Sequence, residues 1–217
     1  MHFRKAYEEQ KDFIGNASHE LQTPLAISLN KLDMLANSGE LNEEQMNLLS
    51  QTFETLQRAT RLNKSLLLLS QIQNEQFVQV SEHNLTQTIQ RVLNDMLEVY
   101  SDKNIMAKIE TESDFIHQMN DSLAVVLINN LLKNAIVHSS SNSLITITSH
   151  EKSLTISNEG QAALDNEKIF TRFYRAGNSK TKESTGLGHT IDKEIAQLSG
   201  LSLEYFYDGK HNFRLKK

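Results

Sequence analysis

The chain has 217 residues, of which 38% are hydrophobic, which is enough for one large domain or two modest ones. Its formal net charge of −5 disfavours nonspecific binding to nucleic acid or to an anionic lipid surface. The absence of cysteine excludes a disulfide framework and a cysteine-ligated metal, and it fits a reducing compartment.

Residues 1 to about 37 are predicted to form one long helix. Its apolar residues recur three, four or seven positions apart and form one stripe: Ile14, Ala17, Leu21, Leu25, Leu32 and Leu35. We expect a bend at Pro24, because proline removes a backbone donor. Gly39 can adopt the left-handed conformation that ends a helix.

His19 is the residue of this helix that points to chemistry. It lies about 200° around the helix from Ala17 and Leu21, so it faces away from the apolar stripe. Glu20 is adjacent, and Thr23 lies one turn further along the same face. An ordinary surface histidine is the alternative. A zinc protease site is set aside, because the second histidine that it needs four residues later is Thr23 here.

A second helix is predicted from an N-cap at Asn42 to about Asn74, with Glu43 and Glu44 in its first turn. Two long amphipathic helices joined by a short turn form an antiparallel hairpin. One hairpin cannot bury both apolar stripes, whereas two hairpins from two chains bury them in a dimeric four-helix bundle. The alternative is that the hairpin packs against the rest of its own chain.

The pattern changes after the second helix. We place an extended link and a loop at residues 77–84, between an all-α hairpin of residues 1–76 and a domain of residues 85–217. In that domain we expect helices over residues 85–101 and 121–138, the second capped by Asp121. Strands are expected over residues 105–110, 115–118, 144–148 and 154–157, and in a hairpin turning at Asp208-Gly209. The predicted fold is α+β, with a layer of helices on a mixed sheet.

Three polar segments of this second domain are weak signals when taken singly. Asn130, Asn134 and His138 share one face of a helix, which is also typical of a solvated face. Asn158-Glu159-Gly160 is more often a turn. Thr185-Gly186-Leu187-Gly188 is a short segment whose glycines allow backbone amides to approach phosphate, and a lone Gly-Leu-Gly is a weak signal.

Taken in order, these motifs resemble those of sensor histidine kinases over residues 10–216. Residues 13–25, FIGNASHELQTPL, resemble the phosphoacceptor box S-H-E-L-x-T-P-L, with Gln22 where the family usually has Arg. NNLLKNA resembles the N box of histidine kinases and related GHKL ATPases. The Asn158 and Gly186 segments resemble the G1 and G2 boxes, and the resemblance to G2 implies that a helix opens at Gly188 with its N-terminus toward phosphate. Phe170 and Phe173 match the F box, where we expect core packing.

The resemblance implies a role for each matching residue. It places Mg²⁺ on Asn134, with Asn130 contacting phosphate or supporting the metal site. It places the adenine amino group on the oxygen of Asn158 and lets the backbone at Gly160 approach the base. Phosphate contacts would come from Gly186, Leu187 and Gly188. The charges of Arg175 and Lys180 would also offset phosphate charge, and the alternative for each is an ordinary solvated surface charge. Residues 176–184, which are polar and basic, would form a mobile lid over the triphosphate.

The implied function is ATP-dependent autophosphorylation of His19, assisted by Glu20, followed by phosphoryl transfer to an aspartate of a response-regulator receiver domain. Thr23 would position a water for dephosphorylating that partner. The implied assembly is a homodimer, and the implied location is the cytoplasm, as the cytoplasmic portion of an inner-membrane sensor. We expect no nucleic-acid partner and no membrane contact from this segment, which has no apolar run near the roughly 20 residues that span a bilayer.

Two alternatives remain. The first is a pseudokinase with the same fold, motivated by the positions at which this chain departs from the family pattern: Gln22, Val137, Asn158, Ala162 and His189. The second is a GHKL ATPase without a phosphohistidine. The hairpin with its S-H-E-L-x-T-P-L run counts against that second alternative.

Overall fold

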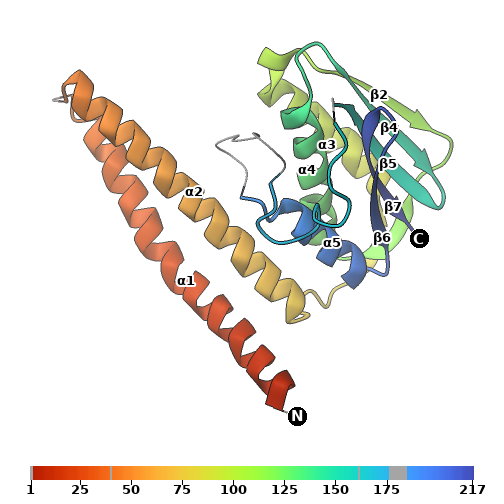
Figure 1. The fold of residues 1–217 in the computed structure, drawn as a ribbon, viewed down its shortest axis with the longest axis horizontal. Coiled ribbons are helices and arrows are strands. Elements are labelled where there is room, and N and C mark those ends of the chain that lie inside the picture. Colours follow the sequence, from red (N-terminus) through yellow and green to blue (C-terminus); the bar gives the residue numbers. More distant parts are fainter. Residues whose placement is uncertain (1, 40, 161, 176–184) are drawn as a thin grey trace. The chain divides into compact units, whose positions relative to one another are not determined.

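The computed structural model describes residues 2–39, 41–160, 162–175 and 185–217, with side chains from residue 14 onward. It divides into two compact units, one holding the first 76 residues and the other holding residues 77–175 and 188–217 (Figure 1). The predicted domain limits, with a linker at residues 77–84, stay a prediction. None of the helices in the described residues is long and apolar enough to cross a membrane.

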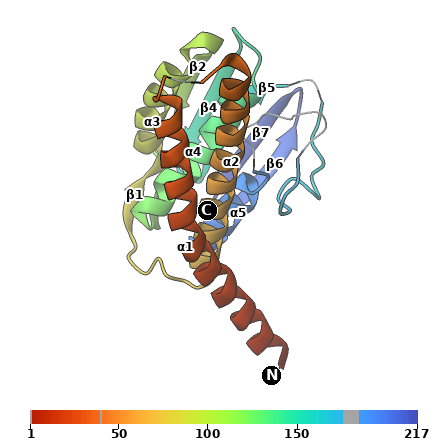
Figure 2. The same ribbon diagram turned by 90° about the vertical axis from the view of Figure 1, so that its left-hand side faces the viewer.

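The first unit contains the predicted helical hairpin, made of α1 (His2–Ala36) and α2 (Glu43–Gln73) (Figures 1 and 2). Helix α1 continues through Pro24. The turn is built as predicted, with Gly39 at a φ of +74° and Asn42 as the N-cap of α2. The Asn42 side chain accepts from the Gln45 backbone N–H, and the Gln45 side chain accepts from the Asn42 backbone N–H.

A buried polar contact ties the two helices together near the middle of the hairpin. Asn63 of α2 donates to the backbone oxygen of Ser18 in α1 over 2.7 Å, and both residues are buried. Two residues of the predicted apolar stripe, Leu21 and Leu35, are nevertheless exposed, and the other four are half-buried. The single hairpin therefore leaves apolar surface uncovered, as the sequence predicts.

The second unit is built on a five-stranded mixed sheet in the order β2-β4-β5-β7-β6. β2 runs parallel to β4, and every other neighbouring pair is antiparallel. The strands of this sheet are β2 (Met106–Thr111), β4 (Leu144–His150), β5 (Ser153–Glu159), β6 (Ser202–Tyr207) and β7 (Lys210–Lys216). β6 and β7 form the hairpin predicted at Asp208-Gly209.

Three helices cover one face of this sheet: α3 (Leu85–Val99), α4 (Asp121–His138) and α5 (Gly188–Leu198) (Figures 1 and 2). A 3-10 turn, η1 (Ser101–Lys103), follows α3. Burial alternates along β4, where Ile145 and Ile147 are fully buried, so one face of the sheet meets the helices. The predicted α+β layer of helices on a mixed sheet is confirmed.

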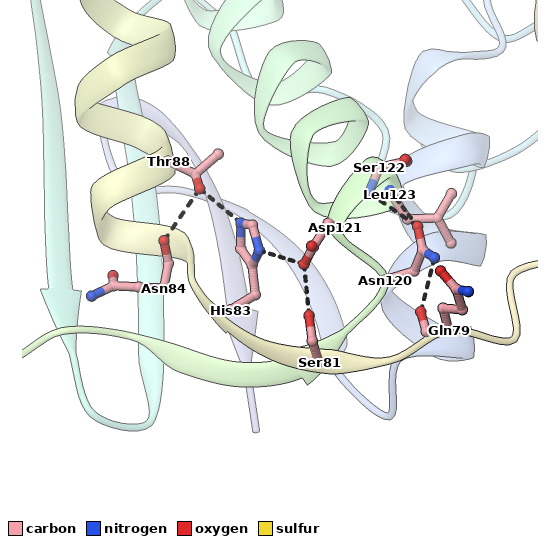
Figure 3. Close-up of polar contacts among 9 residues, drawn as sticks. All are labelled: Gln79, Ser81, His83, Asn84, Thr88, Asn120, Asp121, Ser122 and Leu123. Atoms are coloured by element: carbon pink, nitrogen blue, oxygen red, sulfur yellow. Dashed lines mark hydrogen bonds and ion pairs between the residues drawn. The ribbon is translucent and has the colours of Figure 1, made fainter.

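Two local predictions were wrong. Ser81–Asn84, predicted as a loop, forms strand β1 and pairs antiparallel with β3 (Ile116–Met119). The N-cap of α4 is Asn120 rather than Asp121, because the Asn120 side chain accepts from the backbone N–H groups of Ser122 and Leu123 (Figure 3). Asp121 instead accepts hydrogen bonds from Ser81 and His83 of β1.

Candidate functional site

The predicted phosphoacceptor group lies on the exposed side of α1. His19, Glu20 and Thr23 are all exposed, whereas Ser18, directly before His19, is buried. The Ser18 carbonyl receives the Asn63 hydrogen bond, so the turn that carries His19 is fastened to α2. The hairpin thus holds an accessible imidazole on a fixed helix turn, beside a carboxylate.

The predicted N box lies on α4, in the other unit. Asn130 and Asn134 are half-buried and lie one turn apart on the same face of the helix. Asn130 donates from Nδ2 to Oδ1 of Asp192 on α5, over 3.0 Å. Within the described part of the chain, no hydrogen bond engages the Asn134 side chain. The Asn134 oxygen is therefore available to an external ligand.

Asn158 lies near the end of β5, and its side chain is almost fully buried. Its Nδ2 donates to the backbone oxygen of Glu159 over 3.1 Å, which leaves its Oδ1 as an acceptor. Such an oxygen can accept a hydrogen bond from an amino group, without the assistance of a full charge.

Gly160 follows β5 and lies directly against another side chain of the chain. The ring of His211 occupies the space that a Cβ at position 160 would need. The Tyr207 hydroxyl donates to the Gly160 carbonyl over 2.9 Å, and the Tyr205 hydroxyl lies 2.8 Å from Nδ1 of His211. Burial lowers the pKa of His211, which favours its neutral form.

The glycine segment opens α5 as predicted. Gly186 has a φ of +73°, Leu187 is fully buried, and Gly188 is the first residue of the helix. The positive end of the α5 dipole and its free backbone N–H groups are therefore at these glycines, which suits an anion.

The remaining predicted residues differ in how far they are buried. Phe170 is half-buried, and its backbone oxygen accepts from the Thr190 hydroxyl over 3.1 Å. Phe173 is 57% exposed with a φ of +63°, so its predicted core role was wrong; it lies in an irregular turn that points its ring outward. Arg175 is half-buried. Lys180 and the predicted lid of residues 176–184 lie outside the described residues.

Sequence reasoning missed Asp192, which the structure joins to the N box. Asp192 is fully buried on α5, and its Oδ2 lies 3.4 Å from Nδ1 of His189. Burial raises the pKa of the Asp192 carboxyl, while His189 and Asn130 act in the opposite direction. The sequence did contain a signal for this residue, because an acidic side chain lies on the apolar face of α5 together with Ile191 and Ile195.

The donor set of this unit fits a cation that is shared with phosphate. Among the described residues, no three His, Cys, Asp or Glu side chains come together to hold a metal ion. A site based on Asn134 would therefore need most of its oxygen ligands from a bound polyphosphate, which is how Mg²⁺ is commonly held.

Comparison with known families divides the chain in the same way. The His Kinase A (phospho-acceptor) domain matches residues 9–75. The Histidine kinase-, DNA gyrase B-, and HSP90-like ATPase matches residues 120–215.

Full-length relatives extend this similarity. The chain is 31% identical to Sensor histidine kinase HprS of Escherichia coli (strain K12), over 97% of the chain and 48% of the relative. It is also 31% identical to Heme sensor protein HssS of Staphylococcus epidermidis, over 95% of the chain and 46% of the relative. The chain thus spans about half the length of these relatives.

Solved structures share the fold. The full-length structure of ShkA in complex with AMPPNP aligns over 94% of this chain and 45% of its own, with a TM-score of 0.75 and 16% identity. Acinetobacter baumannii histidine kinase AdeS aligns over 91% of this chain and 96% of its own, with a TM-score of 0.62 and 20% identity. At these identities the likeness establishes the fold alone.

Proposed function

The chain belongs to the sensor histidine kinase family, and we propose that it transfers the γ-phosphoryl group of ATP to His19. The observation that carries this proposal is the exposed imidazole of His19, beside Glu20, on a helix turn held by the Ser18–Asn63 contact. Two-component signalling and autophosphorylation are supported by the two domain matches and by the named relatives.

The second unit would supply the nucleotide, since its ATPase domain match implies ATP binding. The acceptor oxygen of Asn158 would receive the adenine amino group, and the glycines that open α5 would approach phosphate. Asn134 would hold Mg²⁺, which supplies charge neutralisation for the phosphate oxygens when bound. The unengaged oxygen of Asn134 fits this role.

At His19 the chemistry is an in-line substitution at phosphorus. The lone pair of one ring nitrogen forms the N–P bond while the bond from phosphorus to the β,γ-bridging oxygen breaks, and ADP leaves with that electron pair. Glu20 would accept a hydrogen bond from the other ring N–H and so offset the positive charge that develops on the imidazole.

The later steps need partners. The phosphoryl group would pass to an aspartate of a response-regulator receiver domain, and Thr23 would position a water for removing it again. A homodimer through the hairpin is supported by the apolar residues that the single hairpin leaves exposed.

A pseudokinase is the second candidate, because two observations favour it. Asn158 is neutral where the family pattern has a charged acceptor, and the His211 ring fills the space beside Gly160. Such a protein would keep the fold and the dimer without turning over ATP.

ADP formation tests the proposal. We expect the parent chain with Mg²⁺ and ATP to release a burst of ADP no larger than the amount of protein. His19→Ala should remove the burst, while His150→Ala, a histidine on β4 of the other unit, should keep it. ADP released equally by His19→Ala would indicate an ATPase without a phosphohistidine, and bound ATP without ADP would indicate the pseudokinase.

A further inference from the structure

Asp192 is an unusual residue to find in the interior of this unit. In the described residues it is the only Asp, Glu, Lys or Arg that is buried, and none of its surface is exposed. A carboxylate loses much hydration free energy on burial, so it is kept inside a protein only where specific partners compensate it. Those partners show what the residue does.

The first partner is Asn130, one turn before Asn134 on α4. The Asn130 Nδ2 lies 3.0 Å from Oδ1 of Asp192. Because Oδ1 of Asp192 accepts this hydrogen bond, it favours the amide orientation of Asn130 that presents NH₂ to α5. The Asn130 oxygen is then directed away from Asp192 and stays available as an acceptor.

The second partner is His189, which lies one turn earlier on the same helix. Its Nδ1 lies 3.4 Å from Oδ2 of Asp192, and neither atom has a hydrogen-bond partner. The His189 ring stacks on Phe213, with centroids 4.5 Å apart and planes at 17°. Its edge-on contact with Phe170, at 6.3 Å, restricts the ring from a second side.

We infer that Asp192 is a positioning residue for the nucleotide site, which holds the Asn130 amide so that its oxygen serves the Mg²⁺–phosphate group, while the His189 ring packs beside its second oxygen. The inference rests on the proposed nucleotide site, and it assigns a role to a contact between the helix of the N box and the helix of the glycine segment. Mutation of a residue that hydrogen-bonds to a metal ligand typically lowers metal affinity by about 10- to 100-fold.

Binding of a non-hydrolysable ATP analogue, measured with and without Mg²⁺, tests this role. In Asp192→Ala we expect the gain in affinity on adding Mg²⁺ to fall by about tenfold or more, with little change in Mg²⁺-free affinity. Asp192→Asn should retain most of the gain, because its side-chain oxygen can still accept from Asn130. Asn130→Ala should lose as much as Asp192→Ala, and the double variant should lose no more.

Gln197→Ala is the matched control, since Gln197 is exposed on the same helix, and urea unfolding of every variant separates stability from binding. Asp192→Ala that lowers the unfolding midpoint but keeps the full Mg²⁺ gain would overturn the inference, leaving only a structural tie. Asp192→Asn that loses as much of the gain as Asp192→Ala would also overturn it. A parent that shows the Mg²⁺ pattern but does not phosphorylate His19 would defeat the proposed function and leave this inference standing.

Discussion

At the scale of single residues, position 160 requires glycine because of a neighbouring side chain and not because of its backbone conformation. The His211 ring fills the space beside it, and the Tyr205 hydroxyl holds that ring from the other side. Gly160→Ala should therefore lower the free energy of unfolding by about 1–3 kcal/mol, as overpacked sites do. Urea unfolding measures this change.

Two variants make the test specific. His211→Ala should remove the clash. Gly160→Ala should therefore lower the free energy of unfolding by less in the His211→Ala protein than in the parent. Gly188→Ala is the control, because a Cβ at Gly188 meets no atom of the described residues within 4 Å. Equal destabilisation by Gly160→Ala and Gly188→Ala would show that the His211 contact does not constrain the site.

Thr23 is exposed one turn from His19, where a hydroxyl can reach a phosphorylated partner. Thr23→Ala should keep autophosphorylation and lose phosphatase activity toward a phosphorylated receiver domain. The measurement is loss of phosphoryl group from the receiver, with Thr55→Ala, an exposed threonine of α2, as the control. Equal phosphatase rates in Thr23→Ala and the parent would refute the role.

Residue positions on a single helix could be predicted from the sequence, and contacts between helices could not. Periodicity alone indicated that His19 faces away from the apolar stripe, and the residue is exposed. The contact of Asn130 with Asp192 joins residues 62 positions apart, which no local pattern encodes. Phe173 was misplaced because an F-x-x-F spacing does not reveal that the second residue has a positive φ.

At the scale of elements, β1 is fastened to the start of α4, the helix that carries Asn130 and Asn134. The Ser81 hydroxyl donates to Asp121 over 2.8 Å, and Nδ1 of His83 lies 3.0 Å from the same oxygen (Figure 3). Asn120 adds a hydrogen bond from its Nδ2 to the Gln79 carbonyl, over 2.8 Å. The first segment of the second unit is thus tied to the helix of the predicted metal ligand.

The Ser81 and His83 contacts hold the pKa of Asp121 below its usual value, with Ser81 the larger cause. A depressed carboxyl pKa stabilises the folded state above the unfolded pKa, about 3.9, and this contribution disappears as the pH falls through the lower folded value. Asp121→Ala should therefore lower the urea midpoint at neutral pH, and the difference from the parent should shrink as the pH approaches 3.

Asp95→Asn, an exposed aspartate of α3, is the control for losing a surface charge. If Asp121→Ala and Asp95→Asn have the same urea midpoint at neutral pH, the contacts of Asp121 with β1 contribute nothing to stability.

Helices α1 to α4 and most strands of the sheet followed from apolar periodicity and turn signals, whereas the start of α5 followed only from the family resemblance of the glycine segment. β1 did not, because Ser-Glu-His-Asn carries no apolar alternation and becomes a strand only through its pairing with β3. The cap of α4 was misplaced by one residue for a similar reason, since Asn120 and Asp121 are both good capping residues and only the side-chain contacts separate them.

At the scale of the whole molecule, the hairpin exposes apolar side chains that a second copy can cover. Ile27 is 51% and Met34 is 67% exposed, and the two lie one heptad apart on α1. The parent should be a dimer by sedimentation, and Ile27→Glu with Met34→Glu should weaken the dimer by about tenfold or more, as loss of buried apolar contacts does.

Val99→Glu is the control, because Val99, at 75%, is even more exposed than Ile27 and Met34 but lies on α3 of the other unit. A parent that sediments as a monomer would contradict the dimeric bundle. The bundle would also be contradicted if the Ile27→Glu, Met34→Glu double variant dimerised as tightly as Val99→Glu.

The central claim is that His19 receives the phosphoryl group of ATP. The most direct test is incubation with γ-labelled ATP and Mg²⁺, comparing the parent with His19→Gln, which keeps a polar side chain without a nucleophilic ring. The account predicts label that is acid-labile, stable in base and absent from His19→Gln. Label of the same amount in both proteins, or no label despite measurable ATP binding, would contradict it.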